Sequence, residues 1–196
     1  GGTMFSHAAE AFAGVSAGDV VTFVPYALAD WDDYADRAIA ALGSFGIEAV
    51  SAHRSSAPAR AILEADVVMM GGGNTFRLLD RLQRTGALAA IAARAHAGMP
   101  YVGSSAGTNV ATPTIRTTND MPIVEPPSLK ALALLNCQLN PHYRNENIAG
   151  FHGETRDMRL QEFMVLNPQT PVLALPEGSA LRQQAEQLIF VPNAAT

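Results

Sequence analysis

The chain has 196 residues, 48% of them apolar, and its 13 Lys and Arg against 18 Asp and Glu give a formal net charge of −5. This length and apolar content predict one α/β domain over residues 1–196, and the scattered basic residues exclude the positive stripe of a nucleic-acid-binding protein. No apolar run approaches the ~18 residues of a membrane span and no signal segment opens the chain, so we expect a cytoplasmic protein that binds no membrane.

The first half of the chain alternates helical patterns with short apolar runs. We predict helices over 6–15, 33–42, 58–63, 74–82 and 87–96, and strands over 20–25, 48–52, 66–70 and from 101 toward Ser105. Gly43 is the predicted C-cap of the second helix. This alternation predicts a doubly wound, mostly parallel sheet with helices on both faces, in which catalytic loops lie at the carboxyl ends of the strands.

The second half is less regular. Residues 113–127 contain four prolines and predict a structured loop or hairpin rather than a helix. A strand over 134–139, an amphipathic helix over 154–166 and strands over 172–175 and 187–191 follow. The single cysteine, Cys137, excludes an internal disulfide, fits a reducing compartment and is predicted to be a buried, small apolar residue.

The most specific chemical signal is Gly-Ser-Ser-Ala-Gly at 103–107, directly after an apolar run. It has the G-x-S-x-G pattern of a nucleophile elbow, in which a strand turns sharply into a helix and the flanking glycines avoid Cβ clashes. Such a turn pushes the central side chain, Ser105, into a cleft. The N–H of Ala106 then lies at the start of a helix, where it can bind an oxyanion. The pattern predicts a serine hydrolase.

A serine nucleophile needs a base and an acid that orients the base. His142 is the best candidate base, because it follows a predicted strand at the same carboxyl edge as Ser105, and His152, in a glycine-flanked turn, is its rival. For the acid, Asp120 lies in the irregular stretch between Ser105 and His142, whereas Glu177 follows a late strand. The sequence leaves these two carboxylates about even as the partner of His142.

Gly71, Gly72 and Gly73 follow a predicted strand and precede a helix. Three glycines let the backbone approach a ligand closely and aim N–H groups at it, so we predict a second oxyanion donor here. The alternative is a tight turn that allows close helix packing. A phosphate site is less consistent with the run, which lacks the Lys-Ser/Thr ending of a P-loop.

Two charged residues lie near the start of the predicted helix at 154–166. If this end faces the cleft, Arg156 is suited to bind a carboxylate bidentately and Glu154 to bind an ammonium, a pair that suits a charged amino acid. The alternative is ordinary solvated charge, with Glu154 at a favourable helix start. No Cys, His or acidic cluster matches a metal motif, so we expect neither a metal nor a cofactor.

Taken together, these segments resemble peptidase E, the aspartyl dipeptidase family S51 of serine peptidases. The resemblance runs from about residue 20 to residue 178 and is carried, in chain order, by the motifs at 71–75, 103–109, 117–122, 140–143 and 153–156. It implies a flavodoxin-like fold akin to class I glutamine amidotransferases, and hydrolysis of dipeptides that begin with aspartate.

The resemblance also implies residue roles. Ser105 is the nucleophile, His142 the base, and Arg156 recognises the aspartyl side chain. Asp120 matches the family aspartate assigned to the charge relay and is the assignment we adopt, while Glu177 matches a glutamate proposed for the same role.

Two positions depart from the family pattern. The chain opens at Gly1 where the family usually has an apolar strand, so we expect that strand to be either missing or cut off. Ser104 stands where close relatives are expected to carry a bulky aromatic residue. This substitution predicts a wider cleft mouth and a less strict preference for aspartate.

Two other functions stay open. A cyanophycinase-like peptidase would use the same serine to cut β-linked aspartyl-arginine, and a non-catalytic domain on this scaffold would bind an acidic amino acid without turnover. For the dipeptidase the expected partner is a small peptide, Asp-Xaa. The oligomeric state is left open, with a homodimer as one candidate.

Overall fold

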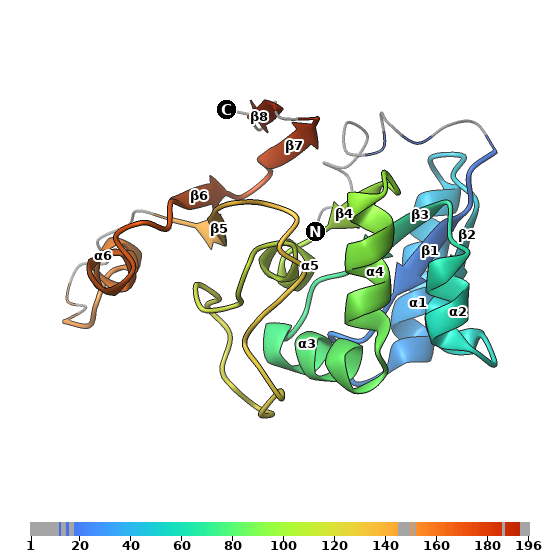
Figure 1. Cartoon of the computed structure of the whole chain (residues 1–196), viewed down its shortest axis with the longest axis horizontal. Helices are drawn as coiled ribbons and strands as arrows, with labels where there is room; N and C mark the ends of the chain where they lie inside the picture. Colours follow the sequence, from blue (N-terminus) through green and yellow to red (C-terminus); the bar gives the residue numbers. More distant parts are fainter. Residues whose placement is uncertain are drawn as a thin grey trace.

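Figure 1 shows the computed structural model of the chain, which describes residues 12, 15, 18–144, 150, 152–185 and 187–192. The helix predicted over 6–15 lies almost wholly outside the described residues.

Four parallel strands form the central sheet, in the order β2-β1-β3-β4. Their bounds are Val21–Val24 for β1, Ala49–Ser51 for β2, Val67–Met70 for β3 and Tyr101–Gly103 for β4. Met70 and Gly103 are register partners at the ends of β3 and β4. The segments that follow these two strands therefore leave the same edge of the sheet side by side, and both carry predicted site residues.

Helices cover both faces of this sheet. Helix α1, Trp31–Gly43, packs on the face that carries Val67 and Met69, whereas Val68 and Met70 point into the opposite core. That second core is completed by α2 (Pro58–Leu63), α3 (Thr75–Arg84), α4 (Ala87–His96) and α5 (Ala106–Val110). The α/β class and the mostly parallel sheet are confirmed. A short 3-10 turn, η1 (Ala52–Arg54), follows β2.

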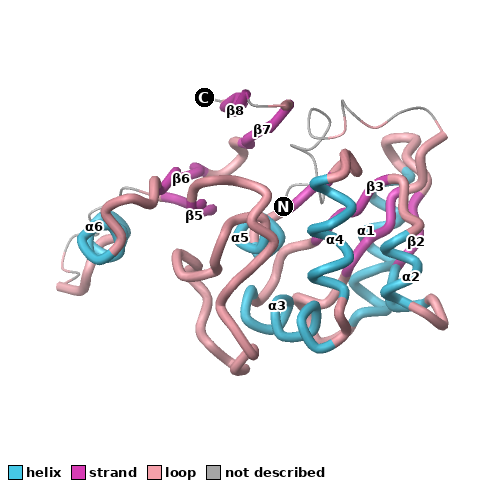
Figure 2. The backbone as a smooth tube through the Cα atoms, in the orientation of Figure 1, coloured by secondary structure: helices cyan, strands magenta, loops and turns pink. Residues whose placement is uncertain are grey.

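The chain after α5 leaves this layered arrangement, as Figure 2 shows. A long irregular segment precedes β5, Gln138–Tyr143, which pairs in parallel with β6, Val172–Pro176, in a separate sheet. Helix α6, Arg156–Leu166, lies between these strands in sequence, and β7 (Ala180–Gln184) with β8 (Gln187–Val191) forms an antiparallel hairpin. In Figure 1 these elements lie to one side of the central sheet.

Several local predictions need correction. The strand predicted over 134–139 begins only at Gln138, because the preceding segment hydrogen-bonds along α5 instead, with Leu134 N–H donating to Ala111 O at 2.9 Å. Gly43 is the last helical residue of α1 rather than its cap. Ser44 is the C-cap, and Gly46 takes the left-handed backbone, with φ 75°.

The C-terminal elements also differ in part from expectation. Strand β7 was not predicted, because its half-exposed and polar residues show no clear period of two. Helix α6 begins at Arg156, two residues later than expected, with Thr155 as its N-cap, and none of its residues is buried. The irregular, proline-rich segment at 113–127 is confirmed, with one isolated bridge between Thr114 and Lys130 at its flanks.

Candidate active site

Ser105 lies at the sharp turn between β4 and α5. Its backbone is strained, with φ 52° and ψ −104°, a conformation that costs free energy and clusters at functional sites. A Cβ on Gly107 would lie 2.5 Å from Met70 O, and one on Gly103 would lie 2.6 Å from Gly107 O. Both flanking positions therefore require glycine, and the strand-turn-helix geometry predicted from the pattern is confirmed.

His142 faces this serine from another part of the fold. Its Nε2 lies 2.8 Å from Ser105 Oγ. The residue lies inside the end of β5 rather than in a loop after it, at a bulge between Pro141 and Tyr143, with φ 56°. The bulge redirects the histidine side chain, as bulges commonly do beside active sites.

Glu177 completes a chain of hydrogen bonds. Its Oε2 lies 2.5 Å from His142 Nδ1. The residue follows β6 directly, and because β5 and β6 run parallel, their carboxyl ends bring the two side chains together. A carboxylate at Nδ1 favours the tautomer that carries its proton there, which leaves Nε2 as an acceptor for the Ser105 hydroxyl. The side chains of His142 and Glu177 are 52% and 60% exposed, so solvent screens this pair.

Asp120 lies elsewhere. Its Oδ2 accepts hydrogen bonds from Thr75 N at 2.8 Å, Thr75 Oγ1 at 2.5 Å and Thr118 Oγ1 at 3.2 Å. These contacts hold the carboxylate at the N-terminal end of α3, where a negative charge is favoured by the helix dipole. The charge that neighbours His142 is that of Glu177, not that of Asp120.

Buried Asn109 links Thr75, which binds Asp120, to the backbone of Ser105. Its Nδ2 lies 3.4 Å from both Thr75 Oγ1 and Ser105 O, and its Oδ1 has no hydrogen-bond partner among the described residues. The residue is 3% exposed. Asn109 was not predicted as a site residue, although it closes the family-like motif at 103–109.

The glycine run lies against the elbow. A Cβ on Gly72 would lie 3.0 Å from Ser105 Cβ and 3.6 Å from its Oγ. Gly71 is confined by the Tyr34 hydroxyl, and Gly73, with φ 132°, by Ala27 O. The two interpretations of this run are compatible, because the turn is tight and also adjoins the serine. Burial raises the pKa of Tyr34, and a hydrogen bond from the Gly72 backbone partly opposes this.

Arg156 is the first residue of α6 and is half-buried. Its Nη1 donates to Asn140 Oδ1 at 3.0 Å, and buried Asn140 in turn donates from Nδ2 to Asn119 Oδ1 at 3.0 Å. Burial, and then the neighbouring Arg159, lower the pKa of Arg156 below its usual value. The two asparagines were not predicted as site residues, although each belongs to a family-like motif.

Glu154 and His152 are both exposed. The Glu154 carboxylate lies 3.7 Å from Arg159 Nε, so it faces a neighbour on its own segment. No hydrogen bond or ion pair joins His152 to any other described residue.

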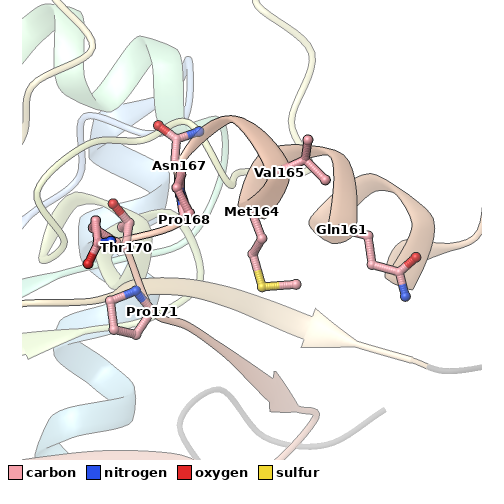
Figure 3. Close-up of a pocket in the computed structure, with 8 residues that line it drawn as sticks. Gln161, Met164, Val165, Asn167, Pro168, Thr170 and Pro171 are labelled. Atoms are coloured by element: carbon pink, nitrogen blue, oxygen red, sulfur yellow. The ribbon is translucent and has the colours of Figure 1, made fainter.

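A separate open hollow of about 850 Å³ lies between the C-terminal end of α6 and the loop that leads to β6 (Figure 3). Its lining contains none of the predicted site residues.

Among the described residues there is no group of three or more Cys, His, Asp and Glu that could hold a metal ion. No helix in the described part of the chain is both long and apolar enough to cross a membrane.

The chain is similar in sequence to one family of peptidases. The model of peptidase family S51 matches residues 1–194. Peptidase E of Streptomyces coelicolor is 48% identical over 186 residues, which cover 94% of this chain and 76% of the relative. Peptidase E of Shewanella denitrificans is 50% identical over 173 residues, 87% of this chain and 74% of the relative.

Two solved structures share the fold. A putative peptidase E from Listeria monocytogenes superposes with a TM-score of 0.71 at 25% identity, covering 96% of this chain and 94% of the other. A peptidase from an acI-B1 actinobacterium superposes with a TM-score of 0.62 at 17% identity, covering 90% and 77%.

Proposed function

The chain belongs to peptidase family S51, and we propose that it is a serine dipeptidase that hydrolyses dipeptides with an N-terminal aspartate. The observation that carries this proposal is that Ser105, in a strained turn, contacts His142, which in turn contacts Glu177. A hydroxyl, an imidazole and a carboxylate in this order form the arrangement that activates a serine nucleophile.

In the proposed mechanism, Ser105 Oγ attacks the scissile carbonyl carbon while His142 Nε2 accepts the hydroxyl proton. Glu177 orients the imidazole and stabilises its protonated form. The N–H of Ala106, at the start of α5, and the N–H of Gly73 bind the oxyanion, because the Gly72 backbone already donates to Tyr34. His142 then gives its proton to the leaving amine, and water hydrolyses the acyl-enzyme.

We assign the recognition of the aspartyl side chain to Arg156. The guanidinium is half-buried and donates to the neutral amide of Asn140, and among the described residues no carboxylate pairs with it, so it retains donors for a carboxylate. The resemblance to peptidase E supports this assignment, as does the set of curated relatives with that name. We also propose that the protein is cytoplasmic.

The test is a dipeptide panel with wild type and two neighbouring variants. Wild type is expected to cleave α-linked Asp-Leu, with Asn-Leu poorer, and β-linked Asp-Arg is included to detect a cyanophycinase-like activity. Ser105→Ala should lose activity by a factor on the order of 10⁴ or more. Ser104→Ala is the matched control and should stay within a few-fold of wild type. Binding of aspartate without turnover, and no labelling of Ser105 by a serine-directed probe, would contradict the proposal.

A further inference from the structure

A buried tyrosine of α1 lies against the glycine run that adjoins the nucleophile. Tyr34 is 6% exposed, and its ring packs edge-on against Phe23 of β1, with the ring centroids 5.1 Å apart. A Cβ on Gly71 would overlap the Tyr34 hydroxyl, so this hydroxyl contacts the backbone of the run directly. Burying a hydroxyl is unfavourable unless it makes a hydrogen bond. The surroundings of the Tyr34 hydroxyl therefore need a polar partner for it.

The backbone of the glycine run supplies this partner. The N–H of Gly72 donates to the Tyr34 hydroxyl. Gly72 also lies against the nucleophile, since a Cβ at this position would lie 3.0 Å from Ser105 Cβ. A single residue thus separates the Tyr34 hydroxyl from the serine side chain.

The other end of the run is held by the loop that follows β1. Asn74 N–H donates to Ala27 O at 2.9 Å, and a Cβ on Gly73 would lie 2.6 Å from the same oxygen. Gly73 has φ 132°, a backbone conformation that glycine adopts at low cost. The N–H groups of Gly72 and Asn74 are thus occupied, whereas that of Gly73 has no acceptor among the described residues. The donor without an acceptor lies between two fixed neighbours.

We propose that Tyr34 is a positioning residue for the oxyanion site: its hydroxyl holds Gly72 from inside the fold and thereby aims the N–H of Gly73 at the developing oxyanion. This inference rests on the proposed serine mechanism. A preorganised donor is effective because it needs no reorganisation when the negative charge develops. Without the hydroxyl, the Gly72 N–H would lack its acceptor and the run would be free to rotate. The loss would affect the transition state and not substrate binding, because the negative charge develops only during the reaction.

The experiment separates these two effects in Tyr34→Phe, which keeps the ring and removes the hydroxyl. For Asp-Leu, kcat should fall about 10- to 100-fold, less than on loss of a whole oxyanion donor, while KM stays within about twofold. A boronic acid analogue of aspartate forms a tetrahedral adduct with a catalytic serine and should lose affinity by the same factor as kcat. L-aspartate should bind as it does to wild type. Tyr26→Phe is the matched control and should match wild type, because this buried tyrosine has no hydrogen bond to the glycine run among the described residues.

Two outcomes would overturn the inference. Tyr34→Phe could keep both kcat and the affinity for the boronic acid within about twofold of wild type, which would mean that the hydroxyl does not act on the oxyanion site. The variant could also bind the boronic acid and aspartate more weakly by the same factor. That result is expected if Tyr34 only supports the fold.

A second measurement needs neither a variant nor a dipeptide. In wild type with isotope-labelled glycine, a fluorophosphonate adduct at Ser105 places a phosphoryl oxygen in the oxyanion site, and nuclear magnetic resonance reports the amide protons. That of Gly73 should shift more than that of Gly72, which stays bonded to Tyr34. A larger shift at Gly72 would refute the role of Tyr34 even if Asp-Leu is cleaved. If wild type shows the expected shifts but does not cleave Asp-Leu, the proposed reaction is wrong and the role of Tyr34 stands.

Discussion

Replacing Glu177 by Gln tests the orientation of the proposed base most directly. The Glu177 carboxylate lies 2.5 Å from His142 Nδ1 and is the acid that the structure brings to this ring. A Gln amide has the same shape without the charge, and its NH₂ group can donate to Nδ1. That donation would favour the tautomer that carries its proton on Nε2, which then cannot accept the Ser105 proton.

The size of the effect follows from the exposure of the pair. A fully buried acid in such a relay contributes about 10⁴ in kcat, or about 5.5 kcal/mol. Here the His142 and Glu177 side chains are 52% and 60% exposed, so solvent screens the charge while the tautomer effect remains. We therefore expect Glu177→Gln to lower kcat/KM for Asp-Leu by about 10²- to 10³-fold, or about 3–4 kcal/mol.

The assay is steady-state cleavage of Asp-Leu, accompanied by the labelling rate of Ser105 with a serine-directed probe. Both rates should fall together, with KM little changed, because Glu177 acts through His142 and not through the substrate. Glu125→Gln is the matched control, since it makes the same substitution at an exposed glutamate that has no hydrogen bond to His142 among the described residues. If Glu177→Gln kept kcat/KM within threefold of wild type while thermal stability was unchanged, the proposed relay would be wrong.

Three further predictions address specificity, the elbow and the cysteine. Arg156→Gln should reduce the preference for Asp-Leu over Asn-Leu from about 10- to 100-fold to nearly one, measured as the ratio of kcat/KM, and an unchanged ratio would place aspartate recognition elsewhere. Gly107→Ala should destabilise the fold by about 1–3 kcal/mol in a denaturant melt and slow Ser105 labelling, because its Cβ would lie 2.5 Å from Met70 O; wild-type values for both would contradict the elbow geometry. Burial raises the pKa of the Cys137 thiol, so less thiolate is present at pH 7–8; a thiol reagent should react slowly with the folded chain and rapidly in denaturant, and equal rates would mean that Cys137 is accessible.

Local sequence determined most of the first half of this protein. The strands β1, β3 and β4 and the helices α2 and α4 lie where hydrophobic period and glycine positions predict them, because β1 and β3 are buried throughout and the other three elements pack apolar side chains against the same core. The turn at Ser105 was also predictable from local sequence, since a Cβ at Gly103 or Gly107 would clash with backbone oxygens and only glycine fits there. The burial of Cys137, at 7% exposure, also agrees with its interpretation as an apolar residue.

Tertiary structure decided which charges meet. Asp120 and Glu177 were about even as partners of His142 by sequence, because both follow irregular or strand-end segments. The parallel pairing of β5 with β6 brings Glu177 to the His142 ring, whereas Asp120 is held by Thr75 at the start of α3, a residue 45 positions away in the chain. Pairing between distant strands and capping by distant residues depend on the packed fold, so no local pattern could distinguish the two carboxylates.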